Sequence, residues 1–324
     1  MFGKIGLEEH YAREDSLQES KRAASPANWP ERKERLLDFH KLRIAEMDKH
    51  GMDMMILSLN APGIQGMHDI PQAIEYARKS NELLAEEIAK NPKRLAGFAA
   101  LPLQDPDEAA AELHRCVKDY GFKGVLANGF SQIHVEDSSY YYDLPQYWPF
   151  WAEVEKLDVP FYLHPRPGLM SQRKMYEGYG WLTNSVWGFS VETATHALRL
   201  MGSGLFDAYP KLNIILGHMG EMLPANIWRS THRLNDVDYE LKFKRPFSEY
   251  LQNNFYVTTS GNFRLSALLT AMLEMGSDRI MFSTDWPYEN VSHAASWFDN
   301  VEISEADRLK IGRLNALNLF SLDL

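Results

Sequence analysis

Residues 159–163, Val-Pro-Phe-Tyr-Leu, and residues 212–216, Leu-Asn-Ile-Ile-Leu, are the stretches that decide the fold of this chain. Each is a short apolar run of strand length, and residues 191–200 between them have the spacing of a helix. This order of strand, helix and strand is typical of parallel βα units. Because one such unit fits many α/β folds, the number of its repetitions decides the architecture.

The same alternation recurs along the whole chain, and each of eight candidate strands is followed by a candidate helix. Eight pairs predict a closed (β/α)8 TIM barrel. No Gly/Ser-rich or Pro-rich linker interrupts the pattern, so we expect a single domain over residues 1–324. The expected strands are 4–7, 52–59, 95–103, 123–128, 159–163, 212–216, 255–259 and 279–283. The expected helices are 31–49, 71–90, 107–119, 147–156, 191–200, 225–234, 265–275 and 306–320.

Composition excludes several classes of partner. The formal net charge is -10, from 34 basic and 44 acidic residues, and no Lys/Arg-rich tract stands out, so we expect no nucleic-acid partner. No apolar stretch is long enough to span a bilayer, so we expect no membrane association. Cys116 is the only cysteine, which excludes an intramolecular disulfide and favours the reducing cytoplasm.

Carboxylates and imidazoles follow four of the predicted strands. Glu8 and His10 come after the first strand, and a period of two residues turns both side chains to one side. His164, His218 and Asp285 follow the fifth, sixth and eighth strands. Barrel enzymes place their catalytic groups at these strand ends, which meet at one mouth of the barrel.

Singly, each of these side chains is as well explained by capping, a salt bridge or packing. Together, two carboxylates and two imidazoles match the nitrogen and oxygen ligands that zinc or manganese prefers. We therefore expect one divalent cation held by Glu8, His10, His164 and Asp285.

At these residues the chain resembles the amidohydrolase superfamily, and within it the branch of metal-dependent decarboxylases of aromatic acids. His10 favours the branch that acts on 2,6-dihydroxybenzoate, because related enzymes for 2,3-dihydroxybenzoate carry alanine there. Pro167 and Tyr288 depart from the Asn and Phe common in this branch. The resemblance covers nearly the full length and depends on six motifs: Gly6-Leu7-Glu8-Glu9-His10, Leu57-Ser58-Leu59-Asn60-Ala61-Pro62, Asn128-Gly129-Phe130-Ser131-Gln132, His164-Pro165-Arg166, Gly217-His218-Met219-Gly220-Glu221 and Ser283-Thr284-Asp285-Trp286-Pro287.

The resemblance implies a carboxy-lyase that uses Mn, Zn or Mg to decarboxylate 2,6-dihydroxybenzoate reversibly to resorcinol, without oxidation. We assign Asp285 as the proton donor, and the spacing of His218 and Glu221, three residues apart where the sixth strand turns into its helix, predicts an imidazole–carboxylate pair beside the substrate. The resemblance also implies a small aromatic hydroxy acid as the bound partner and a homotetramer as the assembly. The side chains expected to contact the substrate are His10, Asn128, His164 and Arg229.

Three alternatives stay open at this level. The substrate can be another ortho-hydroxybenzoate, such as 2,3-dihydroxybenzoate or salicylate. The same scaffold also permits a hydrolase with a metal-bound hydroxide and Asp285 as base, or a catalytically silent barrel that binds a ligand or partner. Two of the site residues also have interpretations without a role in the site. Glu221 can cap the start of a helix, and Arg229 can form a surface salt bridge.

Overall fold

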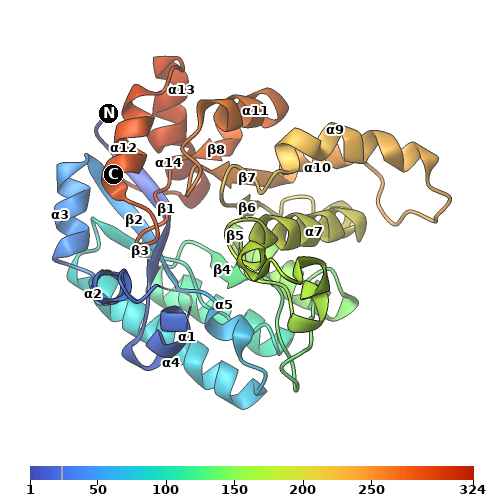
Figure 1. Cartoon of the computed structure of the whole chain (residues 1–324), viewed down its shortest axis with the longest axis horizontal. Helices are drawn as coiled ribbons and strands as arrows, with labels where there is room; N and C mark the ends of the chain where they lie inside the picture. Colours follow the sequence, from blue (N-terminus) through green and yellow to red (C-terminus); the bar gives the residue numbers. More distant parts are fainter. Residues whose placement is uncertain (23–24) are drawn as a thin grey trace.

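The computed structural model describes residues 1–22 and 25–324, and within them eight parallel strands form a closed ring. One sheet has the order β1-β2-β3 and the other β4-β5-β6-β7-β8. Parallel bridges from Ala99 to Val125 and from Glu9 to Trp286 join the two sheets at both seams. The predicted (β/α)8 barrel is confirmed (Figure 1). The strands are β1 (Lys4–Tyr11), β2 (Met52–Leu59), β3 (Leu95–Gly97), β4 (Val125–Asn128), β5 (Phe161–His164), β6 (Ile214–Leu216), β7 (Phe255–Thr258) and β8 (Ile280–Met281).

Helices surround the ring of strands, and most lie where the apolar spacing places them (Figure 1). The short helices α1, α8, α10 and α12 were not predicted, since no helix was assigned to the segments that contain them. The helices are α1 (Leu17–Arg22), α2 (Trp29–Leu37), α3 (Leu42–Lys49), α4 (Ile70–Lys90), α5 (Pro106–Tyr120), α6 (Trp148–Leu157), α7 (Gly188–Gly202), α8 (Leu205–Ala208), α9 (Leu223–Arg233), α10 (Phe247–Asn254), α11 (Leu265–Met275), α12 (Val291–Asn300), α13 (Glu305–Leu309) and α14 (Asn315–Phe320).

The helix predicted over residues 31–49 is wrong as a single element, because the chain turns between α2 and α3. Asp38 has an extended backbone, and its carboxylate accepts hydrogen bonds from the amides of Lys41, at 3.1 Å, and Arg43, at 2.9 Å. A side chain that bonds nearby amides in this way competes with the helical hydrogen bonds. The predicted helix 306–320 is likewise three consecutive helical pieces, with a π-helical turn at Lys310–Leu314 between α13 and α14.

The interior has two apolar layers. Alternate strand residues, among them Ile5, Leu7, Ile56 and Ile215, fill the inside of the barrel together with Phe320 of the last helix. The opposite strand faces pack against the surrounding helices in a larger core. The side chains of both layers are almost fully buried, so the strand ends are held on a rigid frame, as a precise site needs.

The pairing of β1 with β2 slips just before the predicted metal ligands. Gly6 and Glu9 are three residues apart, yet they pair with residues of β2 that are two apart. Such a bulge re-aims the side chains that follow it. Leu7 belongs to the inner layer, so strict alternation would turn Glu8 outward, and the bulge instead lets Glu8 and His10 both face the mouth.

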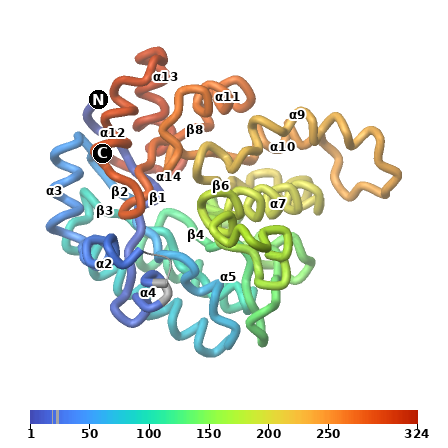
Figure 2. The backbone as a smooth tube through the Cα atoms, in the orientation of Figure 1, coloured from blue at the N-terminus to red at the C-terminus, as the bar shows by residue number. Residues whose placement is uncertain are grey.

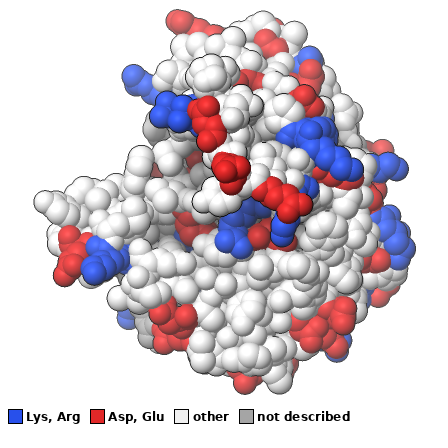
Figure 3. Space-filling model, turned by 90° about the vertical axis from the view of Figure 1, so that its right-hand side faces the viewer, with Lys and Arg blue, Asp and Glu red and all other residues white. Residues whose placement is uncertain are grey.

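The chain ends lie side by side, since Arg313 donates hydrogen bonds to the carbonyl oxygens of Gly3, at 2.7 Å, and Leu324, at 3.3 Å (Figure 2). Helix α9 and the segment after it extend away from the barrel. On the face drawn in Figure 3, acidic and basic side chains are interspersed rather than separated by sign. In the described parts of the chain, the helices are all too short or too polar to cross a bilayer. The single domain stays a prediction.

Candidate active site

Two carboxylates and three imidazoles meet at the C-terminal mouth of the barrel, and we call them the mouth cluster: Glu8, His10, His164, His218 and Asp285. Glu8 Oε1 lies 3.2 Å from His164 Nε2 and 3.6 Å from His218 Nε2. Asp285 lies 3.5 Å from His10 Nε2 through Oδ1 and 3.7 Å from His218 Nε2 through Oδ2. The structure thus brings the four predicted ligands together and adds His218 to them.

The donor atoms of the mouth cluster fit a cation. Glu8 Oε1 and His10 Nε2 are buried, and neither has a hydrogen-bond partner within residues 1–22 and 25–324. Buried polar atoms are normally paired, so these two point to a group that they bind together. His10 Nδ1 lies 3.0 Å from Ser58 Oγ, which turns Nε2 toward the cluster. Burial lowers the pKa of His10 and so favours the neutral imidazole that binds metals.

The second oxygen of Glu8 is held by hydroxyl groups. Tyr162 and Ser260 both donate hydrogen bonds to Glu8 Oε2, and Tyr162 also lies 2.9 Å from Thr258 Oγ1. A Cβ atom at Gly217 would lie 2.6 Å from Glu8 Oε2, so this approach requires glycine. Although burial raises the pKa of Glu8, the neighbouring imidazoles hold it well below its usual range, so the carboxylate is ionised.

The mouth is built on strained backbone. Asp285 has a φ of 70°, in the left-handed region that non-glycine residues rarely adopt. The segment after β6 has five consecutive residues with positive φ, namely His218 at 50°, Met219 at 59°, Gly220 at 80°, Glu221 at 52° and Met222 at 68°. Backbone of this kind persists only where the surroundings enforce it, and it concentrates at functional sites.

His218 and Glu221 form the predicted pair. His218 Nδ1 lies 2.6 Å from Glu221 Oε1, and Ser190 Oγ donates to Glu221 Oε2 at 2.7 Å. Helix α9 starts at Leu223 with Met222 as its N-cap and no side-chain capping bond, so Glu221 holds His218 instead of capping the helix. Burial lowers the pKa of His218, but the carboxylates of Glu8, Glu221 and Asp285 outweigh it and hold the pKa well above its usual value.

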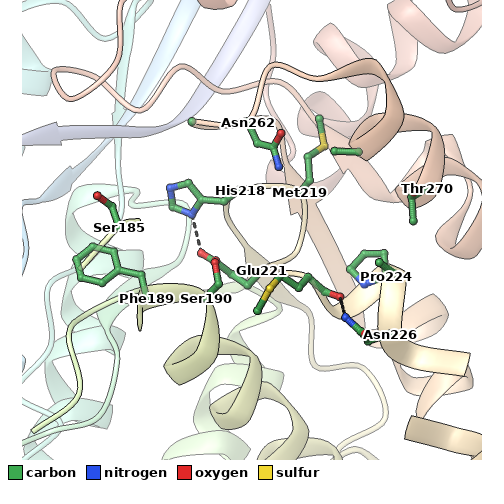
Figure 4. Close-up of a pocket in the computed structure, with 14 residues that line it drawn as sticks. Ser185, Phe189, Ser190, His218, Met219, Glu221, Pro224, Asn226, Asn262 and Thr270 are labelled. Atoms are coloured by element: carbon green, nitrogen blue, oxygen red, sulfur yellow. Dashed lines mark hydrogen bonds and ion pairs between the residues drawn. The ribbon is translucent and has the colours of Figure 1, made fainter. Parts of the chain in front are cut away.

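A cavity of about 450 Å³ opens beside His218 (Figure 4). Phe189 and Ser190 at the start of α7 lie on one side of it, and Asn262 lies on the other. The cavity is large enough for a single aromatic ring with small substituents, within the size range of small-molecule sites. Its wall mixes apolar and polar groups, as recognition of an aromatic acid requires.

Asn128 and Arg229, two predicted substrate contacts, are placed differently. Asn128 ends β4 in register with His164 of β5, and its buried Oδ1 has no hydrogen-bond partner within the described chain. Asn128 is therefore available next to the mouth cluster. Arg229 is exposed on α9 and is not among the residues that line the cavity, so this chain does not bring it to its own site. Both substrate roles stay predictions.

Several residues that shape the site were not predicted. Tyr162 precedes His164 by two residues in β5, and this spacing was an available signal for a shared side. Ser58 and Ser260 come from the ends of β2 and β7, where a serine carries no signal of its own. Glu9 was quoted only as part of a motif, although its carboxylate is fully buried beside β8.

Glu192 of α7 gives a test of electrostatics outside the mouth cluster. Burial raises the pKa of this side chain, which is 7% exposed, to about 7. The folded protein therefore keeps a proton that the unfolded chain releases above its ordinary pKa of 4.5, so stability falls as the pH rises from 4.5 through 7. We expect Glu192→Gln to be more stable than the parent at pH 8, by about 3 kcal/mol at most.

Denaturant unfolding of both proteins at pH 5 and pH 8 measures this effect. The variant's advantage should fall to well under half at pH 5, where Glu192 is protonated in the fold but mostly ionised in the unfolded chain. An advantage that is the same at both pH values would mean that ionisation of Glu192 is not its cause.

The chain belongs to the amidohydrolase family, whose model matches residues 11–322. It is 56% identical to the γ-resorcylate decarboxylase of Polaromonas sp. strain JS666 over 325 residues, which cover 100% of both chains. A crystal structure of a 2,6-dihydroxybenzoate decarboxylase complexed with 2,6-dihydroxybenzoate matches with a TM-score of 0.97 and 56% identity, over 99% of this chain and 100% of the other. The Polaromonas dihydroxybenzoic acid decarboxylase, solved with manganese and the inhibitor 2-nitroresorcinol, also matches at TM-score 0.97 and 56% identity, over 99% and 97% of the two chains.

Proposed function

We propose that this chain is a metal-dependent carboxy-lyase that decarboxylates 2,6-dihydroxybenzoate (γ-resorcylate) to resorcinol and carbon dioxide. The observation that carries the proposal is the mouth cluster, with its unpartnered buried donor atoms beside a cavity that has room for one substituted aromatic ring. Relatives at 56% identity over the full length are decarboxylases of this acid. Their likeness favours decarboxylation over a hydrolase or a silent barrel.

Four residues of the mouth cluster, Glu8, His10, His164 and Asp285, would hold one divalent cation. We take manganese as the cation in preference to zinc or magnesium, because the solved Polaromonas relative carries manganese. When bound, the cation supplies a positive charge that orients and polarises the substrate's carboxylate and one ortho hydroxyl. His10 and His164, turned toward the same point, would also contact the substrate.

The chemistry requires a proton donor. Direct loss of carbon dioxide would leave an aryl anion in the plane of the ring, which nothing stabilises. The two ortho hydroxyls raise the electron density at the carboxyl-bearing carbon, so Asp285 would first transfer a proton to that carbon. The carbon–carbon bond then breaks, its electron pair returns to the ring, and carbon dioxide leaves. Asp285 regains its proton from solvent, and the same steps in reverse carboxylate resorcinol.

The pair of His218 and Glu221 would orient these groups. Glu221 holds the orientation of the imidazole through Nδ1, and His218 Nε2 then faces Glu8 and Asp285. We expect Glu221→Gln to lower kcat about 10- to 100-fold while the protein stays folded. Steady-state kinetics together with the melting temperature measures this, and a variant with unchanged kcat would remove Glu221 from the mechanism.

Substrate profiling tests the proposed function. Purified protein loaded with Mn²⁺ is incubated with 2,6-dihydroxybenzoate, 2,3-dihydroxybenzoate and salicylate, and with a panel of esters, lactones and amides. We expect resorcinol and carbon dioxide from 2,6-dihydroxybenzoate, with a higher kcat/KM than for the other two acids. Activity on the hydrolase panel alone, or on none of the compounds, would overturn the proposal.

We further propose that the chain forms a homotetramer. Helix α9 and the segment after it extend from the barrel and carry the exposed apolar side chains of Trp228, Tyr239 and Leu241. Exposed apolar groups on a protruding element favour a protein partner, and a second copy of the chain is the partner that is always present. Light scattering should give four times the chain mass of 37.3 kDa, and a monomer would contradict the proposal.

We also place the enzyme in the cytoplasm. Support comes from the single cysteine, Cys116, which is buried in α5 and leaves the fold without need of an oxidising compartment. Cell fractionation tests the assignment.

A further inference from the structure

The seam between the first and the last strand carries three of the four proposed metal ligands. Strand β1 supplies Glu8 and His10, and the chain after β8 supplies Asp285. In the described residues these two strands share no regular ladder of hydrogen bonds. A single parallel bridge from Glu9 to Trp286 connects them. The amide of His10 donates to the Trp286 carbonyl oxygen at 2.7 Å. Side chains must therefore fix the rest of the seam.

The carboxylate of Glu9 accepts most of the side-chain hydrogen bonds across this seam. Its Oε1 accepts hydrogen bonds from Ser283 Oγ, at 3.1 Å, and from the amide of Thr284, at 2.9 Å. Its Oε2 accepts from Thr284 Oγ1 and from the amide of Trp286, at 3.2 Å. The two amides belong to the residues immediately before and after Asp285, so hydrogen bonds to one carboxylate hold the backbone on both sides of that residue.

Neighbouring residues are shaped around this carboxylate. A Cβ atom at Gly6 would lie 2.3 Å from Glu9 Oε1, so the glycine makes room for it. Arg43, also fully buried, provides the nearest positive charge and donates to the His10 carbonyl oxygen at 2.7 Å. Glu9 itself is fully buried, contacts the backbone around Asp285, and is not among the residues that line the cavity.

We propose that Glu9 is a positioning residue that holds Asp285 in its left-handed conformation and thereby aims this carboxylate at the cation and the substrate. The inference deepens the proposed function and depends on it for the role of Asp285. At a φ of 70°, Asp285 relaxes unless both flanking amides are held. Glutamine in place of Glu9 has the same size, but its NH2 group would face N–H and O–H donors in place of an acceptor.

A double-mutant cycle on Mn²⁺ affinity tests the proposal. Metal-free protein is titrated with Mn²⁺ while free Mn²⁺ is followed by electron paramagnetic resonance, for the parent, Glu9→Gln, Asp285→Asn and the double variant. Groups that support metal ligands typically change metal affinity 10- to 100-fold. We expect Glu9→Gln to weaken binding at least about tenfold in the parent, and less than about twofold in the Asp285→Asn background.

An equal loss in both backgrounds, or no loss in the parent, would overturn the proposal. Because no turnover is measured, the cycle tests Glu9 even if 2,6-dihydroxybenzoate is not the substrate. If the Asp285→Asn variant binds Mn²⁺ too weakly to titrate, the separate effects of Glu9→Gln on kcat and on KM test the proposal instead. A positioning role predicts a kcat lowered at least about tenfold with a nearly unchanged KM, and an unchanged kcat would overturn it.

Two further variants separate positioning from stability. Gly6→Ala should reproduce the loss of Mn²⁺ affinity, because its Cβ displaces the Glu9 carboxylate. Glu112→Gln is the matched control: Glu112 is another buried carboxylate, located in α5, and its hydrogen-bond partners Asn81 and Arg115 do not belong to the mouth cluster. It should lower the melting temperature without changing Mn²⁺ affinity. A loss of affinity in Glu112→Gln as large as in Glu9→Gln would show that stability alone is responsible.

Discussion

Asparagine in place of Asp285 is expected to lower kcat for 2,6-dihydroxybenzoate about a thousandfold or more. General acid catalysis by a positioned side chain contributes about 10²- to 10⁴-fold, and this substitution removes the acid while keeping the size of the side chain. Asparagine is also a weaker ligand for a hard cation, so Mn²⁺ affinity should fall as well. Measuring kcat at saturating Mn²⁺ separates the loss of the proton donor from the loss of metal.

Asp278→Asn is the matched control. Asp278 is an exposed aspartate in the turn before β8, where it pairs with Lys310 at 2.8 Å. It should retain parental kcat and Mn²⁺ content. If Asp285→Asn at saturating Mn²⁺ keeps a kcat within tenfold of the parent, another group donates the proton, and His218 at 3.7 Å becomes the first candidate.

Removal of the cation is expected to abolish turnover altogether. Without it, the substrate's carboxylate would enter a mouth that already contains the buried, ionised carboxylate of Glu8, and like charges at short range repel strongly in a poorly solvated site. The ring would be neither bound nor oriented. Dialysis against a chelator, followed by assay and Mn²⁺ titration, should show activity returning in proportion to the metal bound, up to one ion per chain.

The fold should survive this treatment, because the apolar layers inside and outside the barrel do not involve the mouth cluster. Circular dichroism before and after dialysis therefore serves as the control. Full activity of protein shown to be metal-free by elemental analysis would contradict the proposed role of the cation. So would an activity that saturates at two ions per chain.

Much of the barrel could be predicted because apolar residues recur along the chain with the periods of strands and helices. The predicted bounds of β2, 52–59, and of α11, 265–275, are those of the structure. Glu8, His164 and Asp285 could be placed at one mouth because parallel strands in a barrel all end on the same face. Burial and strand order thus carry enough information to bring distant residues together.

Features that depend on local register or on single hydrogen bonds could not be predicted. The bulge in β1 that turns Glu8 and His10 inward leaves no mark in the apolar pattern. The hydrogen bonds that Glu9 accepts from the backbone around Asp285 can be recognised only when β1 and β8 are known to be adjacent. Arg229 was expected to contact the substrate because a guanidinium can pair with a carboxylate, and only the structure shows it exposed on helix α9.

The proposed metal site brings together four side chains that are distant in sequence around one cation. Crystals grown with Mn²⁺ and measured at its absorption edge test this most directly. We expect one anomalous peak per chain, about 2.2 Å from donor atoms of Glu8, His10, His164 and Asp285. A peak elsewhere, or one at the barrel mouth that any of the four does not reach, would contradict the proposed site.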